Sequence, residues 1–175
     1  MELPYDQRRP ETWRDTADTI ADIADKFADR LLIGAGTVLS PELAELTWLH
    51  GGAFIVAPNT DPAVIRRARE LGMVSIPGAM TPTEILAAHD AGADMVKLFP
   101  ASELGVGYLK AIRAPISHVD ILAAGGITAA NARDFLDAGA MSLGVGGALA
   151  NRAALAQGRF ADISRAAEAL LLAIE

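Results

Sequence analysis

The sequence contains no cysteine. This absence excludes a disulfide framework, a thiol nucleophile and a cysteine-bound metal. Aromatic residues make up only 5% of the 175 residues, and the 51% hydrophobic content comes mostly from alanine, leucine and isoleucine. That composition is typical of a one-domain α/β protein, in which many small helix-to-sheet contacts fill the core.

Positive charge and long apolar runs are also scarce. The formal net charge is −7, and the arginine clusters at residues 8–9 and 66–69 are short and separate. A phosphate-binding surface needs clustered Lys and Arg, so nucleic acid is excluded as a general partner. No apolar run approaches the length of a membrane span, and the polar, acidic N-terminus is unlike a signal peptide. We therefore expect a cytoplasmic protein with no membrane partner.

One pattern repeats from about Arg30 onward: a short apolar run, a loop, then an amphipathic helix. The apolar runs occupy residues 31–33, 53–56, 73–76, 95–98, 119–123 and 141–145. Near-continuous apolar runs that alternate with helices are typical of parallel strands buried on both faces. The pattern predicts a parallel α/β fold with one further helix near residues 11–28 and a terminal helix at 160–174.

Helix ends are marked along the chain. Ser40, Asp61 and Thr81 each precede a proline, which predicts an N-cap followed by proline at the first helical position. Glu84 stands three residues after Thr81, the spacing of a capping box. Glycines at 51–52, 72, 92 and 139 are expected to end helices in the left-handed conformation.

Two parallel folds are compatible with this pattern. A doubly wound sheet should carry Gly-x-Gly-x-x-Gly after its first strand, and residues 34–37 match only half of that motif. A (β/α)8 barrel instead predicts even repeats and a phosphate site after its last strands. Glycine pairs follow the last two apolar runs, at Gly125-Gly126 and at Gly146-Gly147 just before the short segment 148–150. Paired glycines let backbone amides approach an anion, and a helix N-terminus there would add a favourable dipole, so the barrel fits better.

Lys97 lies within the apolar run at 95–98. On a strand its side chain shares a face with Met95 and Phe99, while Val96 and Leu98 point the other way. Burial of an ammonium lowers its pKa, and a neutral amine can attack a carbonyl to form a Schiff base. The alternative is a lysine whose stem covers apolar surface while its head reaches water.

The three histidines do not indicate a metal site. His50, His89 and His118 form no metal-ligand spacing with one another or with carboxylates, so we expect structural or surface roles. The sequence shows no serine triad order either.

Five motifs resemble one family, the 2-keto-3-deoxy-6-phosphogluconate (KDPG) and 2-dehydro-3-deoxy-6-phosphogalactonate aldolases. They are Gly-Ala-Gly-Thr-Val-Leu at 34–39, Ala-Pro-Asn-Thr at 57–60, Pro-Gly-Ala-Met-Thr-Pro-Thr-Glu at 77–84, Lys-Leu-Phe-Pro-Ala at 97–101 and Gly-Gly-Ile-Thr at 125–128. The resemblance implies a (β/α)8 TIM barrel, here lacking the first strand and helix, as a single domain over residues 1–175. It also implies a class I aldolase of carbohydrate metabolism, usually a homotrimer, that needs no metal or cofactor. Such a lyase cleaves a phosphorylated 2-keto-3-deoxy sugar acid into pyruvate and glyceraldehyde 3-phosphate.

The resemblance also implies site residues. Lys97 matches the Schiff-base lysine, and Glu2 matches the acid/base glutamate that moves protons during the reaction. Thr37 and the Pro58 turn match residues around the pyruvate carboxylate, and Phe99 matches the aromatic beside the lysine. The phosphate group would be held by backbone amides of both glycine pairs, Gly125, Gly126, Gly146 and Gly147.

The chain departs from the family in three places. The first strand is missing together with its substrate-binding arginine, Gly147 replaces a common serine, and Asp6 stands where relatives carry arginine or asparagine. An acid at residue 6 is expected to repel a substrate carboxylate. An alternative function is therefore a truncated or degenerate barrel that binds a phosphorylated ligand without turnover, and a frayed terminal residue is the alternative for Glu2.

A third option is a thiamine phosphate synthase-like barrel, against which the Lys-Leu-Phe-Pro series argues. Open strand edges would be covered by the terminal helix, by a neighbouring subunit or by an exchanged segment, so we expect a homo-oligomer. The sequence does not distinguish a gluconate from a galactonate substrate.

Overall fold

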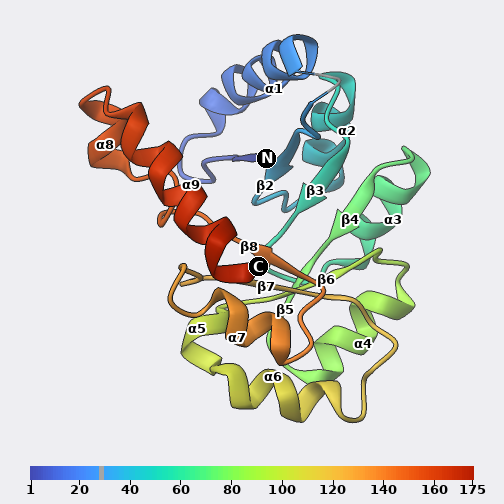
Figure 1. The fold of residues 1–175 in the computed structure, drawn as a ribbon. Coiled ribbons are helices and arrows are strands. Elements are labelled where there is room, and N and C mark those ends of the chain that lie inside the picture. The colour runs from blue at the N-terminus through green and yellow to red at the C-terminus, as the bar shows by residue number, and fades with distance from the viewer. Residues whose placement is uncertain (28–29) are drawn as a thin grey trace. The chain divides into compact units, whose positions relative to one another are not determined.

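The structure is a computed structural model that describes residues 1–27 and 30–175. By its internal contacts the chain divides into two compact units, unit 1 (Met1–Lys97) and unit 2 (Leu98–Glu175), whose elements are labelled in Figure 1. Each unit alternates short strands with helices, in agreement with the predicted α/β class. The prediction of a single domain over residues 1–175 stays a prediction. Within the described ranges, no helix is long and apolar enough to cross a membrane.

Unit 1 contains most of the strands. Its elements are β1 (Glu2–Pro4), the 3-10 helix η1 (Pro10–Thr12), α1 (Trp13–Phe27), β2 (Gly34–Gly36), α2 (Pro41–Leu49), β3 (Phe54–Val56), α3 (Pro62–Glu70), β4 (Val74–Ile76), β5 (Gly78–Ala79), α4 (Pro82–Asp90) and β6 (Val96–Leu98), whose last residue belongs to unit 2. The predicted helix at 11–28 corresponds to η1 and α1, and its predicted end at residue 28 lies outside the described residues.

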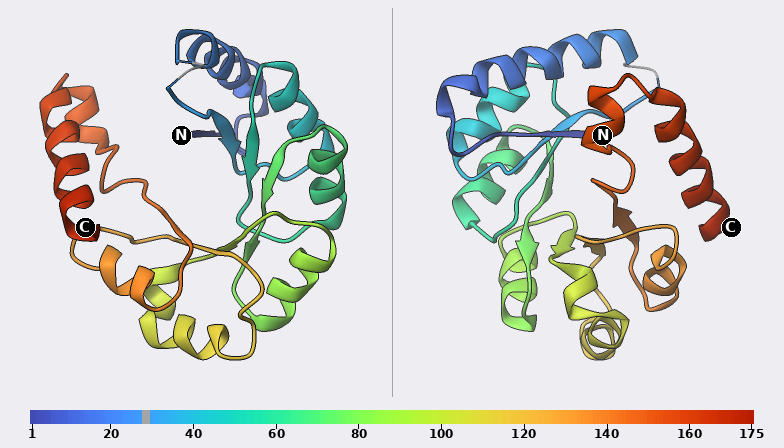
Figure 2. Two further views of the ribbon diagram at one scale, coloured as in Figure 1. Left: turned by 45° about the vertical axis from the view of Figure 1, so that its right-hand side comes forward. Right: turned by 90° about the vertical axis from the view of Figure 1, so that its left-hand side faces the viewer.

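Strands β1 to β4 pair in parallel and in the order of the sequence. A doubly wound sheet reverses its strand order at a switch point. No reversal occurs among these four strands, so their order is that of a barrel wall. Helices α1, α2 and α3 lie on one side of them (Figure 2).

The first predicted strand was misplaced. Residues 31–33 form no strand, and Leu31 and Leu32 are exposed, whereas β2 begins at Gly34. The register explains the shift, because Gly34 and Gly36 pair with Glu2 and Pro4 of β1. The apolar residues 31–33 precede the strand. Pairing with β1 places the strand itself at the small residues 34–36.

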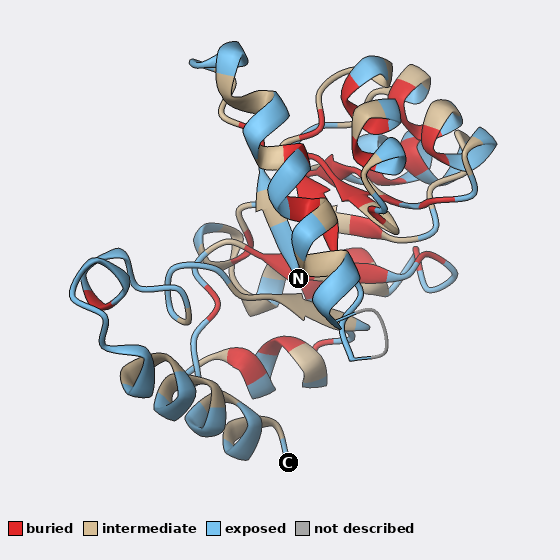
Figure 3. Ribbon diagram, turned by 90° about the horizontal axis from the view of Figure 1, so that it is seen from above, coloured by how far each residue is buried: buried red, intermediate tan, exposed pale blue. Residues whose placement is uncertain are grey.

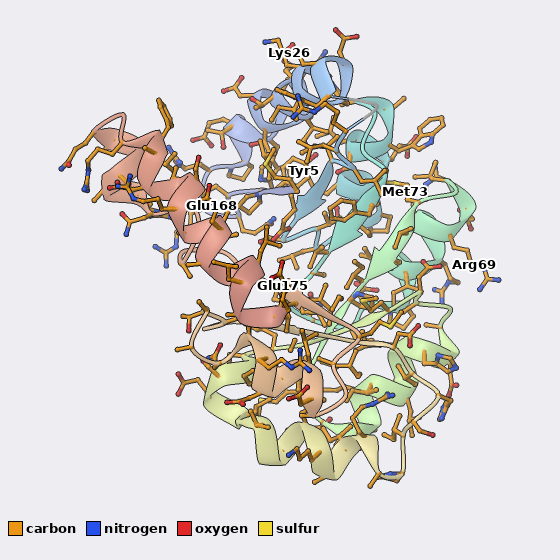
Figure 4. The ribbon with its side chains drawn as sticks, viewed as in Figure 1. Tyr5, Lys26, Arg69, Met73, Glu168 and Glu175 are labelled. Atoms are coloured by element: carbon orange, nitrogen blue, oxygen red, sulfur yellow. The ribbon has the colours of Figure 1, made fainter. Side chains whose placement is uncertain are left out.

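A core fills the space between this sheet and its helices. Tyr5 and Met73, labelled in Figure 4, belong to it together with the residues Ile20, Ile33, Ala35, Val38, Leu43, Ala44, Ile55, Val64 and Ala68. The Tyr5 hydroxyl lies 3.0 Å from Thr47 Oγ1, which donates to the Leu43 carbonyl at 2.7 Å. The buried residues of the strands are seen in Figure 3. Tyr5 therefore fixes β1 against α2 with its polar group satisfied.

The predicted N-caps are confirmed. Ser40 Oγ accepts from the Leu43 amide, Asp61 Oδ1 accepts from the Ala63 amide, and Thr81 with Glu84 forms a capping box. Four of the helix-ending glycines are confirmed, with left-handed φ values of 79° at Gly51, 71° at Gly72, 97° at Gly92 and 100° at Gly139. The prediction was wrong for Gly52, whose φ lies outside the left-handed region.

Unit 2 continues the alternation with α5 (Ala101–Leu104), α6 (Val106–Arg113), β7 (Ile121–Ala124), α7 (Ala132–Asp137), β8 (Ser142–Gly144), α8 (Arg152–Ala156) and α9 (Phe160–Ile174). Strands β7 and β8 pair in parallel. Helix α9 has the predicted bounds. It contains no buried residue, and Leu171 and Leu172 are 58% and 70% exposed.

The segment after the second glycine pair differs from the expectation of a helix N-terminus. Residues 148–150 form a turn, and α8 begins only at Arg152. The Asn151 side chain caps α8, since its Oδ1 accepts from the amides of Ala153 and Ala154 at 3.0 and 3.1 Å. Two of the free amides at this helix terminus are therefore already occupied.

Candidate active site

The predicted site residues fall in both units. In unit 1, Lys97 lies on β6 between Val96 and Leu98, which are both fully buried. The Lys97 side chain points to the opposite face and is half-buried, as the alternation along a strand requires. Burial lowers the pKa of the Lys97 amine, and the negative charge of Glu2 partly opposes this by raising it.

Glu2 extends from β1 over the neighbouring strand β2. A Cβ atom added to Gly36 would lie 1.8 Å from Glu2 Oε2 and 2.6 Å from its Cδ, so the carboxyl group occupies the space that a side chain at residue 36 would take. Glu2 as a whole residue is exposed, whereas its carboxyl group lies among protein atoms. This partial desolvation raises the pKa of the Glu2 carboxyl, and the positive charges of Lys97 and of the N-terminus lower it.

Glu2 and Lys97 therefore form an electrostatic pair in which burial moves both pKa values toward neutrality. A raised carboxyl pKa keeps a proton available, and a lowered ammonium pKa releases one. The two pKa values thus lie closer together than those of the free groups, which eases proton exchange between Glu2 and Lys97.

Thr37 and Pro58 follow β2 and β3, two adjacent parallel strands. Thr37 has φ of 56°, the one positive φ outside glycine in the described part of the chain. The Pro58 turn packs on Gly78, where an added Cβ would lie 2.3 Å from the Pro58 carbonyl carbon. Two hydrogen bonds fix this turn, from the Gly78 amide to the Asn59 carbonyl at 3.1 Å and from Thr60 Oγ1 to the Gly78 carbonyl at 3.0 Å.

In unit 2, the first glycine pair forms a left-handed turn after β7. Gly125 and Gly126 have φ values of 91° and 75°, which side chains rarely adopt. The Phe99 ring covers Gly125, since an added Cβ would lie 3.0 Å from two of its carbons, and Ser102 Oγ lies over Gly126. The Ser102 amide donates to the Gly125 carbonyl at 3.0 Å. The turn is thus held from both sides by the segment that follows β6.

The second glycine pair differs from the first. Gly146 and Gly147 are exposed, their φ values lie outside the left-handed region, and nothing lies within 4 Å of an added Cβ. Nothing in their conformation requires glycine.

Asp6 does not carry a free charge. Its carboxylate accepts from the Arg8 amide at 2.9 Å and from Arg9 Nε at 2.8 Å. The hydrogen bond from Arg9 is the main reason that the pKa of Asp6 is lowered. The repulsion expected from this residue is therefore offset locally by Arg9.

His50 has two polar contacts. His50 ends α2, with Nδ1 2.8 Å from the Leu46 carbonyl and Nε2 3.2 Å from Asp18 Oδ1. Within residues 1–27 and 30–175, no group of His, Asp and Glu has a metal-binding arrangement.

Sequence reasoning missed three residues of this region: Gly36 under Glu2, Gly78 under the Pro58 turn, and Gln7, whose Nε2 donates to the Thr37 carbonyl at 2.8 Å. The signal for Gly36 was present, because the glycines of residues 34–36 alternate and share one face of the strand. Gln7 carried no such signal, since its contact spans 30 residues of sequence.

Comparisons with known proteins agree on one family. The family model described as KDPG and KHG aldolase matches residues 12–166. The 2-dehydro-3-deoxy-6-phosphogalactonate aldolase of Escherichia coli K12 is 43% identical over 129 residues, which are 73% of this chain and 63% of that protein. The probable enzyme of the same name from Rhizobium meliloti is 48% identical over 119 residues, or 67% of this chain and 56% of that protein. The matches thus span less than two thirds of these relatives.

Solved structures support the fold. A structure described as native KDPGal superposes with a TM-score of 0.83 at 32% identity, covering 98% of this chain and 91% of that one. Thiamine phosphate pyrophosphorylase from Pyrococcus furiosus, at a TM-score of 0.72, 17% identity and coverage of 99% and 81%, shares the fold alone. The predicted barrel-type α/β class is confirmed, and the chain belongs to the KDPG and KHG aldolase family.

Proposed function

We propose that this chain is a class I aldolase that cleaves a phosphorylated 2-keto-3-deoxy sugar acid through a Schiff base at Lys97. The observation that carries the proposal is the pairing of a half-buried strand lysine, whose pKa burial lowers, with a carboxylate whose pKa burial raises. The names of the relatives from Escherichia coli and Rhizobium meliloti support the choice of substrate class.

In this mechanism the neutral Lys97 amine attacks the C2 carbonyl and forms a carbinolamine. Glu2 protonates the departing hydroxyl, and loss of water leaves an iminium ion. The Glu2 carboxylate then takes a proton from the C4 hydroxyl, directly or through a water, while the C3–C4 bond breaks. Its electron pair moves into the iminium, which gives an aldehyde and an enamine. Protonation at C3 and hydrolysis release pyruvate and regenerate the amine, so the water lost earlier is returned.

The other predicted residues have binding roles in this proposal. Thr37 and the Pro58 turn would hold the carboxylate of the keto acid, and Phe99 would flank the reacting carbons. The Gly125-Gly126 turn would present backbone amides to the phosphate group, as left-handed glycine turns do for anions. Gly146 and Gly147, which lie on an exposed segment, would complete the phosphate site.

The direct test combines pyruvate with borohydride, which reduces a Schiff base to a stable adduct. We expect a mass increment that maps to the Lys97 peptide, and no increment in Lys97→Met. A matched control is Lys110→Met, which removes an exposed lysine on α6 and should leave labelling intact.

Turnover is measured separately as pyruvate release from both phosphorylated sugar acids. An unmodified Lys97 peptide would refute the Schiff-base mechanism. Thermal stabilisation by the phosphorylated substrate without pyruvate release would instead identify a binding protein without turnover.

We also propose that the chain assembles as a homo-oligomer, with a trimer as the expected state. Exposed large apolar side chains on α9, including Phe160, Leu171 and Leu172, support this, because such surfaces are usually covered by a partner. Light scattering tests it, and a monomer at micromolar concentration would contradict it. A cytoplasmic location stays a prediction.

A further inference from the structure

Gln7 lies just beyond β1, where the chain turns toward η1, and its side chain reaches back to the loop after β2. Gln7 Nε2 donates to the Thr37 carbonyl at 2.8 Å, across 30 residues of sequence. We infer that Gln7 is a positioning residue that holds Thr37 in the conformation needed to bind the keto acid carboxylate. This inference rests on the proposed function of the site.

Main-chain pairing explains why a side chain is needed at this point. The Gly34 amide donates to Met1 and the Tyr5 amide donates to Gly36, both at 3.0 Å, so β1 and β2 are paired up to Gly36. The Val38 amide donates instead to Val56 of β3 at 3.1 Å. The main chain that continues from β2 therefore changes its hydrogen-bonding partner at Thr37, from β1 to β3. The Gln7 side chain donates to the Thr37 carbonyl, just beyond the last main-chain hydrogen bond with β1.

The conformation of Thr37 makes this bond consequential. Its φ of 56° lies in the left-handed region, which a β-branched residue adopts only when its surroundings impose it. Val38 is buried and bonded to β3 on one side of Thr37, and Gly36 is bonded to β1 on the other. The Gln7 amide adds a third constraint, directly on the strained residue.

Gln7 itself is held by its neighbours. The Asp6 carbonyl accepts from Trp13 Nε1 at 2.9 Å and from the Arg9 amide at 3.1 Å. The Asp6 carboxylate accepts from the Arg8 amide and from Arg9 Nε. Four hydrogen bonds thus fix the backbone turn around Gln7, so its side chain starts from a defined position beside the Thr37 loop. Asp6, the acidic residue that departs from the family pattern, thus anchors this turn.

Gln7→Met tests the inference, because methionine keeps the length and volume of glutamine but donates no hydrogen bond. The half-saturating pyruvate concentration for labelling of Lys97 by borohydride should rise roughly three- to tenfold, the loss expected for one hydrogen bond. KM for the cleaved substrate should rise by a similar factor, and kcat should change less than twofold. Gln7→Lys, which retains a donor at similar reach, should restore most of the affinity.

Gln157→Met is the matched control, since it changes an exposed glutamine at the end of α8. If wild-type protein is not labelled at Lys97, the proposed function fails. If wild-type protein is labelled and Gln7→Met requires no more pyruvate than Gln157→Met, the inference is overturned. It is also overturned if Gln7→Lys is impaired as much as Gln7→Met, because the donor would then be irrelevant. A loss of thermal stability in Gln7→Met with unchanged pyruvate affinity would likewise reduce Gln7 to a structural role.

Discussion

Gly36 provides the sharpest test of how the fold supports the proposed chemistry. In Gly36→Ala the new methyl group would lie 1.8 Å from Glu2 Oε2, whereas ordinary contacts begin at 3.4 Å. The carboxyl group must therefore move by more than an ångström. No other atom lies nearer than the Glu2 side chain, which has solvent beside it and can swing away. The substitution should displace the acid/base group and leave the sheet in place.

The magnitude follows from the role of that group. A positioned general acid or base contributes roughly 10²–10⁴-fold to a rate, and a misplacement of about 1 Å can remove about 10²-fold. We expect Gly36→Ala to lower kcat for pyruvate release by at least about 10²-fold, or about 2.7 kcal/mol. The free energy of unfolding should change by less than about 1 kcal/mol, since Gly36 has no left-handed φ and alanine restricts the unfolded chain.

The assay couples released pyruvate to NADH oxidation by lactate dehydrogenase, with thermal melting in parallel. Gly107→Ala is the matched control, because this glycine in α6 has no atom within 4 Å of an added Cβ and an ordinary φ. The double variant Glu2→Ala with Gly36→Ala should be no slower than Glu2→Ala alone, because the two changes remove the same function. Wild-type kcat in Gly36→Ala would refute the reasoning, and so would an additive loss in the double variant.

Two further predictions concern charge. The negative charge of Glu2 raises the pKa of the Lys97 amine. Glu2→Gln should therefore move the pH midpoint of Lys97 labelling downward and slow turnover. An unchanged or upward-shifted midpoint would exclude the electrostatic coupling. At α4, Thr81→Ala should cost about 1 kcal/mol of stability in denaturant unfolding by removing the capping box, whereas Thr83→Ala, an exposed neighbour in the same turn, should cost under about 0.5 kcal/mol. The pKa of Glu84 is lowered by its bonds to the Met80 and Thr81 amides, so its share of this stability is present above its ordinary value of 4.5 and is lost as the pH falls through the lowered value. Equal losses in both threonine variants would contradict the prediction.

Local chemistry made much of the fold predictable. Ser40, Asp61 and Thr81 begin helices as expected, because an N-cap bond joins residues two or three positions apart. The lysine face of β6 was equally predictable, since Val96 and Leu98 alternate with Lys97 along one strand. These features depend on sequence neighbours alone.

Features that depend on one specific partner were predicted less well. The strand expected at 31–33 lies at 34–36 because β1 sets the register, and β1 is 30 residues away in sequence. The helix start expected near residue 148 was wrong because the Asn151 side chain caps the first amides of α8, which places the first helical residue at Arg152. In both cases a specific partner, invisible to composition or periodicity, decides the outcome. The repulsion expected between Asp6 and a substrate carboxylate stays a prediction, and in the structure Asp6 contacts Arg8 and Arg9.

The alternation of β1 has a consequence for folding fidelity. Glu2 lies on one side of β1, a strand of only three residues (Glu2–Pro4), and Tyr5, the next residue, faces the helices on the other side. A slip of one residue would exchange the two faces, bury the Glu2 carboxylate among apolar side chains and expose the Tyr5 ring. The misregistered chain would thus lose stability at the same step at which it lost its acid/base group. A misregistered β1 is therefore both inactive and unstable. Cellular quality control that recognises instability would thereby also remove the inactive form.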